Sequence, residues 1–171
     1  MRAHRLLLRG AVPALAVRVT LFAVSVAVVG IAEPFPLWFW VAVVLAGVGA
    51  VFPRTFAAWG VIPCVGVAVL SSEPEAWRTA ILVLGVHLIH VLASVTWIAP
   101  WSAWITLSAM RPSFGRMLAV ELIVQPVILV IGLIPRVSGA GFAWLAPLGA
   151  LAIVGVAMLM RRVHDEGEQP R

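Results

Sequence analysis

The residues of this chain that could do chemistry are few, and they lie inside long apolar segments. His87, His90 and Ser94 follow one another at intervals of three and four residues, a spacing that places them on one face of a helix. Glu121 and Gln125 stand four residues apart in a later apolar segment. An ionisable side chain in hydrocarbon costs on the order of 2.5 to 3.5 kcal/mol to insert, so these polar residues are the candidates for a function.

The two polar groups occupy similar depths in segments that are expected to run antiparallel. His90 and Gln125 each lie near the middle of a segment, and Ser94 and Glu121 each lie one turn closer to the same face. Matched depth predicts a polar seam in which His90 meets Gln125 and Ser94 meets Glu121. Substitutions on either side of such a seam would disturb one shared property.

The simplest role for this seam is to hold two helices together, at about 0.6 kcal/mol per interhelical hydrogen bond. A second role is a relay for protons or cations, with Glu121 as carrier and a histidine that titrates near neutral pH as its partner. A metal or haem site at His87 and His90 is the weakest alternative, because the HxxH pair lacks a clear third ligand besides Glu121. Two ligands on one helix face also cannot take opposite sides of a haem iron. We therefore expect no metal and no other cofactor.

The elements that must position these residues are membrane-spanning helices. Only 11% of the 171 residues are charged, 63% are hydrophobic, and residues 79–110 carry no formal charge. A soluble domain of this size needs a far more charged surface. All 12 basic residues are arginines at the ends of apolar segments, which favours membrane anchoring over a nucleic-acid interface. The lone cysteine, Cys64, excludes an intrachain disulfide.

Six apolar segments come close to the roughly 20 residues that a helix needs to cross about 30 Å of hydrocarbon. Prolines, glycines and charged turns separate them. The predicted spans cover residues 11–32, 37–52, 55–72, 79–99, 117–134 and 142–160. The chain is thus predicted to be an all-α, polytopic membrane protein with a six-helix transmembrane domain over residues 1–162.

Two further segments complete the predicted architecture. Aromatic and apolar residues recur at helical spacing between the fourth and fifth spans and predict a short interfacial helix near residues 101–110, with an extended loop as the alternative. Residues 163–171 are polar and predict a disordered cytoplasmic tail.

Charge and tryptophan placement predict the orientation. With a cytoplasmic N-terminus, nine arginines fall inside, whereas Arg78 and Arg136 fall outside beside three glutamates. The tryptophans fall near the two boundaries, where indole rings are favoured. We expect a plasma-membrane protein with both termini in the cytoplasm. A cleaved secretory signal over the first 32 residues is the less favoured alternative, because many apolar spans follow it.

A stripe of small residues, Ala42, Ala46 and Ala50, recurs every four residues in the second predicted span. Small residues let helix backbones approach closely in a membrane. We expect this stripe to serve packing inside the bundle, with a dimer interface as the less favoured alternative.

Motif content favours a protein that is not an enzyme, since neither GxSxG, HExxH nor a phosphate-binding loop occurs. The short loops and the lack of a soluble domain predict a non-enzymatic accessory or assembly subunit of a larger membrane complex. The alternative is a small-solute or proton/ion carrier, or the membrane subunit of one, that uses the polar seam. The expected partners are the lipid bilayer and either another membrane protein or further copies of the chain, and not nucleic acid.

Overall fold

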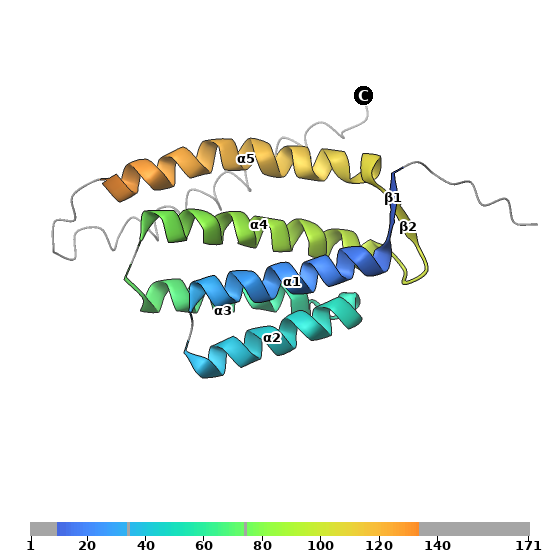
Figure 1. Cartoon of the computed structure of the whole chain (residues 1–171), viewed down its shortest axis with the longest axis horizontal. Helices are drawn as coiled ribbons and strands as arrows, with labels where there is room; N and C mark the ends of the chain where they lie inside the picture. Colours follow the sequence, from blue (N-terminus) through green and yellow to red (C-terminus); the bar gives the residue numbers. More distant parts are fainter. Residues whose placement is uncertain (1–9, 34, 74, 134–171) are drawn as a thin grey trace, which may run out of the picture. The chain divides into compact units, whose positions relative to one another are not determined.

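The computed structural model describes residues 10–133 of the chain, except Pro34 and Pro74 (Figure 1). The described part is all-helical apart from one pair of three-residue strands. The helices are α1 (Ala14–Ala32), α2 (Pro36–Val51), α3 (Ala57–Ser71), α4 (Ala76–Ile98) and α5 (Leu107–Leu133), with a 3₁₀ turn η1 (Pro53–Thr55) between α2 and α3. The predicted sixth span and the predicted tail lie outside the described residues.

Three of these helices are long and apolar enough to cross a membrane. They are α1, α4 and the part of α5 from Leu107 to Val130. The helices α2 and α3 are equally apolar but have 16 and 15 residues, which corresponds to about 24 and 22 Å at 1.5 Å per residue. The prediction of an all-helical protein with membrane-spanning helices is confirmed to this extent.

The first helix begins three residues later than the sequence predicted. Residues Ala11–Pro13 form strand β1, which pairs antiparallel with strand β2 (Trp104–Thr106). Proline disfavours a helical conformation at the residue before it, so Val12 adopts an extended conformation and α1 starts directly after Pro13.

The predicted interfacial helix near residues 101–110 is wrong. A turn follows α4, β2 comes next, and α5 already begins at Leu107, ten residues before the predicted start at 117. The fifth predicted span starts only at residue 117, whereas the structure continues one helix through Pro112 at the loss of one backbone hydrogen bond. Backbone bonds from Leu107 to Gly10 and from Ala14 to Ala103, at 3.0 and 2.9 Å, extend the strand pairing on both sides.

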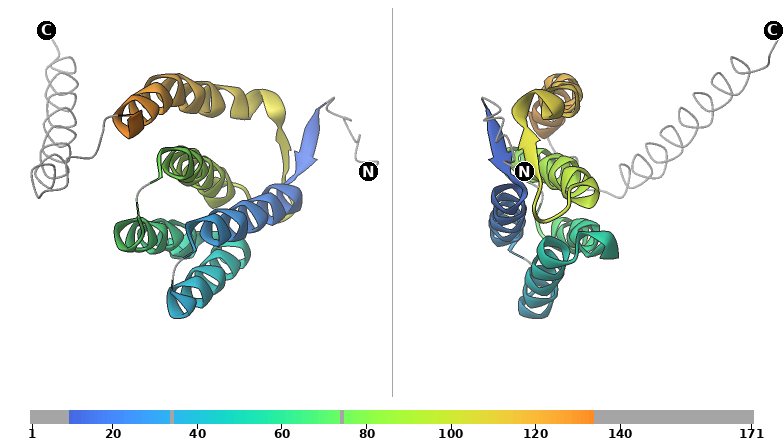
Figure 2. Two further views of the ribbon diagram at one scale, coloured as in Figure 1. Left: turned by 60° about the vertical axis from the view of Figure 1, so that its left-hand side comes forward. Right: turned by 90° about the vertical axis from the view of Figure 1, so that its right-hand side faces the viewer.

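The helices α1 to α4 form a bundle, and α5 packs mainly against α4 at its edge (Figure 2). Within the bundle α1 contacts α2 and α4, and α2 and α3 form a tight hairpin. The approach of this hairpin is closest at Gly49, where a Cβ would overlap the backbone of Ala58. Phe56, which follows the 3₁₀ turn, reverses the chain in a left-handed conformation with φ of 57°.

The small residues of α2 face the inside of this bundle. Ala42 and Ala46 are buried in the hydrophobic core that α1, α2 and α3 share. The third member, Ala50, is half-buried, and its carbonyl accepts a hydrogen bond from Arg18 of α1. The stripe therefore serves helix packing within the chain at these positions.

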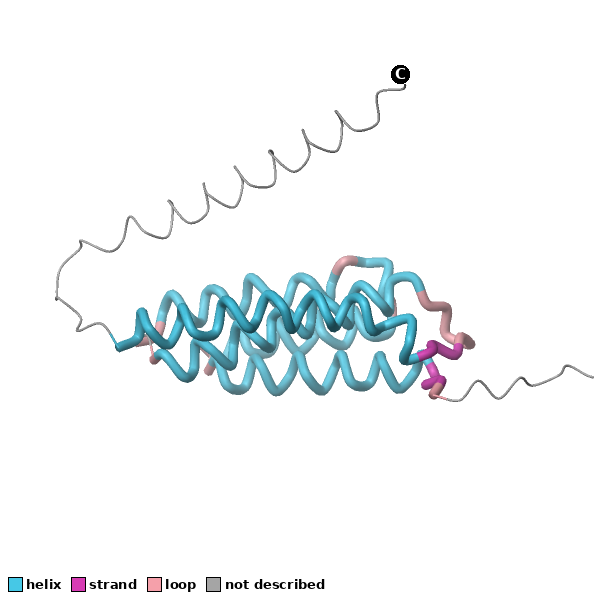
Figure 3. Tube along the Cα trace, turned by 90° about the horizontal axis from the view of Figure 1, so that it is seen from above, coloured by secondary structure: helices cyan, strands magenta, loops and turns pink. Residues whose placement is uncertain are grey.

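Charged residues divide between the two ends of the bundle. Figure 3 shows the strand pair at one end, and this end also carries Arg54 and Arg111. The opposite end carries Arg78 and the glutamates that follow α1 and α3, namely Glu33, Glu73 and Glu75. One end of the described bundle is therefore basic and the other mainly acidic.

Candidate functional site

A carboxylate with two side-chain partners lies between α4 and α5. Glu121 of α5 is 5% exposed. The Nδ1–H of His87 donates to its Oε1, and the Nε2–H of Gln125 donates to its Oε2. Both oxygens of this buried acid are therefore hydrogen-bonded, as a charge or a strong acceptor in an apolar environment requires.

Gln125 connects the two helices a second time. Its amide also donates to the backbone carbonyl of Ala80 on α4, at 3.0 Å. The carboxamide thus bridges the carboxylate on its own helix and the backbone of the neighbouring one. The close spacing of Glu121 and Gln125, four residues apart on α5, makes this bridge possible.

His87 lies at the midpoint of α4, far from both helix ends. Its side chain is 37% exposed, whereas that of Glu121 is 6% exposed. The imidazole thus reaches the surface of the described bundle, while the carboxylate that it contacts is enclosed.

His90 belongs to a different group of side chains. Its Nδ1 accepts a hydrogen bond from Nε1 of Trp59 on α3, at 3.1 Å. Trp59 in turn packs against Trp97, with ring centroids 5.5 Å apart, and both rings contact Phe56. This aromatic cluster lies where the start of α3 contacts α4. Glu121 and its partners lie elsewhere, where α5 contacts α4.

Ser94 lies outside both groups. Its hydroxyl donates to the carbonyl of His90 in the preceding turn of its own helix, at 2.8 Å. This is the common local bond of a serine within a helix.

The predicted pairs His90–Gln125 and Ser94–Glu121 are therefore wrong. Glu121 meets His87, seven residues earlier on α4 than the predicted partner Ser94. Seven residues correspond to two helical turns, or about 10 Å. The depth was counted from an assumed helix start at residue 117, and the actual start at Leu107 moves the whole of α5 relative to α4.

Sequence reasoning missed two residues that the structure makes prominent. Trp59 appeared only as a boundary tryptophan, and its bond to His90 has no local signal because 31 residues separate the two. Arg18 lies inside the first predicted span, where its long side chain is expected to reach toward the inner membrane surface, yet it is 2% exposed. A charge inside an otherwise apolar span is itself the signal that could have marked it.

Within the described residues, no three His, Cys, Asp or Glu side chains gather closely enough to hold a metal ion. His87 and His90 each bind a different side chain, so they do not point at a common ligand. Comparison of the chain with protein-family models, with curated proteins and with solved structures found no match.

Proposed function

We propose that the chain is a multi-pass protein of the plasma membrane with six spans and both termini in the cytoplasm. In this arrangement α2 and α3 are short spans in a locally thinned bilayer, and residues 142–160 supply the sixth. The division of charge supports this orientation, because the basic end of the described bundle then faces the cytoplasm and the acidic end faces outward. Short helices joined by a tight turn also fit a hairpin that crosses twice.

Cysteine accessibility tests this topology. In a Cys64→Ala background, Glu73→Cys should react with a membrane-impermeant maleimide in intact cells, because residue 73 would lie outside. Thr55→Cys and Ser102→Cys should react only after the cells are opened. Labelling of Thr55→Cys in intact cells would contradict a hairpin that crosses the membrane.

We further propose that the protein is a non-enzymatic accessory or assembly subunit of a larger membrane complex. The observation that carries this proposal is the closed polar contact between α4 and α5. Both oxygens of Glu121 are bonded to side chains of the same bundle, and Gln125 bonds to the backbone of α4. The scarce polar groups thus support a helix-joining role, since they are engaged in attaching α5.

The outer face of α5 is the surface that we expect to contact the partner subunit. Leu122, Ile123 and Val130 are among its most exposed side chains, at 77%, 70% and 60%. The helix has only α4 as an extensive neighbour among the described elements. A helix that is polar toward its own bundle and apolar on its outer face suits contact with a helix of another membrane subunit.

Site-specific photo-crosslinking tests the subunit role. A photo-crosslinking residue replacing Ile123 should give one adduct of defined mass, in near-stoichiometric yield, that copurifies with the chain. The matched control replaces Val44, an exposed apolar residue of α2. Lipid adducts alone at both positions would contradict the proposal.

A carrier of protons or other cations is the second candidate, and the exposure of His87 favours it. A histidine in direct contact with a buried carboxylate is the kind of pair that such a carrier uses, and the 37% exposure of the His87 side chain leaves one side of the pair open to a group from outside the described bundle. Purified chain in liposomes would then move protons, and Glu121→Gln would abolish the movement. His90→Ala is the matched control, because His90 contacts Trp59 and not Glu121. Equal flux from liposomes with and without the protein would exclude this function.

A further inference from the structure

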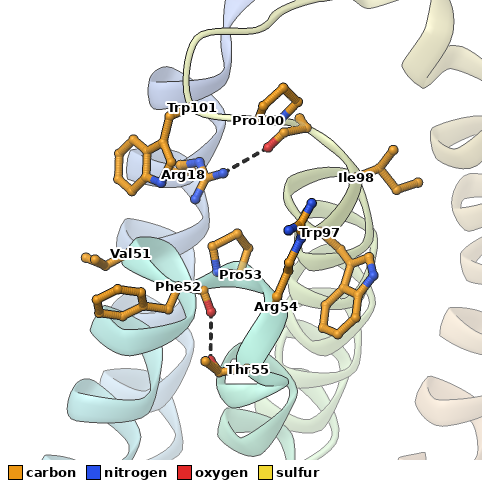
Figure 4. A pocket seen from close by; sticks show the side chains of 11 residues that line it. Arg18, Val51, Phe52, Pro53, Arg54, Thr55, Trp97, Ile98, Pro100 and Trp101 are labelled. Carbon is orange, nitrogen blue, oxygen red and sulfur yellow. Dashed lines mark hydrogen bonds between the residues drawn. The ribbon is translucent and has the colours of Figure 1, made fainter.

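A cavity of about 400 Å³ opens at the basic end of the bundle, between the ends of α2 and α4 (Figure 4). This volume lies within the roughly 300–1,000 Å³ that small-molecule sites occupy. Two arginines line it, Arg18 from α1 and Arg54 from η1. Figure 4 shows both guanidinium groups pointing into the same space, one from each side.

Arg18 is held in place by the backbone around it. Its Nη1 donates to the carbonyl of Ala50 at 3.0 Å, and its Nη2 donates to the carbonyl of Ala99 at 2.9 Å. Its guanidinium carbon lies 4.2 Å from the centre of the Trp101 ring. The side chain is 2% exposed, and its Nε–H has no partner within the described structure. Five N–H groups belong to a guanidinium, so three of them, the buried Nε–H included, are not engaged by the described residues.

Arg54 adds a second positive charge that packing does not require. It is exposed, and the ion pairs between described residues involve Arg78 and His87 rather than Arg54. None of the described residues that line the cavity is acidic. Two like charges that face one cavity without a counter-charge repel each other, and an anion between them would remove this repulsion.

The rim of the cavity is apolar. Phe52, Ile98 and Trp101 line it and are 61%, 82% and 52% exposed. In the proposed topology this rim lies at the inner surface of the membrane, where acyl chains begin. A ligand with an anionic head and an apolar tail would contact the arginines and the rim together.

We propose that this cavity binds a phosphate group, with the arginines as donors to its oxygens and the apolar rim in contact with an attached acyl chain. Arginine suits this ligand because its planar group offers two parallel N–H donors to phosphate oxygens. The ligand class is a phosphorylated lipid, and a soluble phosphate ester is the other source of the same head group. The proposal does not depend on whether the protein acts as a subunit or as a carrier.

Titration of the purified chain in an uncharged maltoside detergent separates these sources. The probes are dioctanoyl phosphatidic acid, dioctanoylglycerol, which has the same chains without phosphate, and glycerol 3-phosphate, which has the phosphate without chains. Binding is followed by calorimetry and by the rise in unfolding temperature. We expect phosphatidic acid to bind at least tenfold more tightly than either fragment. Equal binding of phosphatidic acid and dioctanoylglycerol would overturn the proposal, whereas equal binding of glycerol 3-phosphate would support the phosphate site with a soluble ligand.

Charge variants locate the site. Arg54→Gln should weaken phosphatidic acid binding by about tenfold or more, since a hydrogen bond to a charged group contributes at least about 1.5 kcal/mol. This variant should fold, because Arg54 is exposed. Arg111→Gln removes the same charge at the same end of the bundle, but Arg111 does not line this cavity. It should change binding less than twofold, and equal losses in the two variants would overturn the proposal.

Discussion

Two arginines cap the C-terminal ends of helices at opposite ends of the bundle, but their charged neighbours differ. Arg78 donates to the carbonyls of Ile31 and Ala32 at the end of α1, at 2.9 and 2.7 Å, and its Nη2 lies 3.3 Å from a carboxylate oxygen of Glu33. Arg18 likewise caps the ends of α2 and α4, but it shares its cavity with Arg54 instead of a carboxylate. Each arginine stabilises the negative end of a helix dipole.

The two ends of the bundle differ in whether the charge of the arginines is neutralised by the chain itself. Capping accounts for one arginine at each end, and the acidic end supplies its own counter-charge. At the basic end Arg54 increases the positive charge, so capping does not explain the pair of arginines. The phosphate group proposed above would supply the counter-charge that the described residues lining the cavity lack.

The largest expected effect concerns the two capping arginines. Arg18→Gln should lower the free energy of unfolding by about 3 kcal/mol, because it leaves two partly buried carbonyls without their donor, at about 1–3 kcal/mol each, and removes a side chain that is only 2% exposed. Arg78→Gln should lower it by about 1 kcal/mol, because the Arg78 side chain is 16% exposed and water can replace part of its contacts. Denaturant unfolding in detergent micelles measures both values. Equal losses would show that the two ends do not differ in burial.

Glu121, which is buried like Arg18, extends the comparison to the middle of the bundle. Glu121 resembles Arg78 in having its partners within the chain, namely His87 and Gln125. Glu121→Leu should destabilise the protein by about 1–2 kcal/mol, since it removes hydrogen bonds of about 0.6 kcal/mol each and leaves polar groups unpaired. Glu121→Gln is the matched control and should lose less than about 0.5 kcal/mol, because an amide can still bond to both neighbours. A loss with Gln as large as the loss with Leu would mean that the charge itself, and not the hydrogen bonds, holds α5.

A smaller effect is expected when the basic end is made to resemble the acidic one. Thr55→Glu places a carboxylate on the wall of the cavity. It should raise the free energy of unfolding by about 0.5 kcal/mol without ligand, as exposed ion pairs do, and it should reduce the stabilisation by phosphatidic acid. Thr55→Gln, which has the size of Glu without its charge and loses the same hydroxyl bond to the Phe52 carbonyl, is the baseline for both quantities. Stabilisation by phosphatidic acid that survives Thr55→Glu would place the lipid elsewhere.

The helices of the described bundle were largely predictable, because their ends carry local signals. The second predicted span, 37–52, matches α2 within one residue at each end, since prolines at 36 and 53 bound it. The start of α5 was not predictable in this way. It depends on the pairing of β1 with β2, which joins residues more than 90 positions apart in the sequence, and on the toleration of Pro112 inside a helix.

The candidate site was predictable in its residue types but not in its pairs. Glu121 and Gln125 drew attention because polar groups are rare in such segments, and both lie at the contact between α4 and α5. Their partners depend on the register of two long helices, which no local pattern specifies. The cavity was beyond prediction for the same reason, because the partners of Arg18 lie 32 and 81 residues away.

The smallest expected effect distinguishes one polar seam from two separate groups. A single seam predicts that His90→Ala and Glu121→Gln disturb the same contact and that their effects on unfolding are not additive. The structure assigns His90 to Trp59 and Glu121 to His87, so the two substitutions share no hydrogen-bond partner. Their effects on the free energy of unfolding should then add within about 0.5 kcal/mol. His87→Ala combined with Glu121→Leu is the positive control, because each of these substitutions removes the direct contact of the pair, and their effects should fall short of additivity by about 0.6 kcal/mol or more. Strong coupling between His90 and Glu121 would mean that α5 lies two turns from its position here. The buried acid would then have Ser94 as its partner on α4 in place of His87.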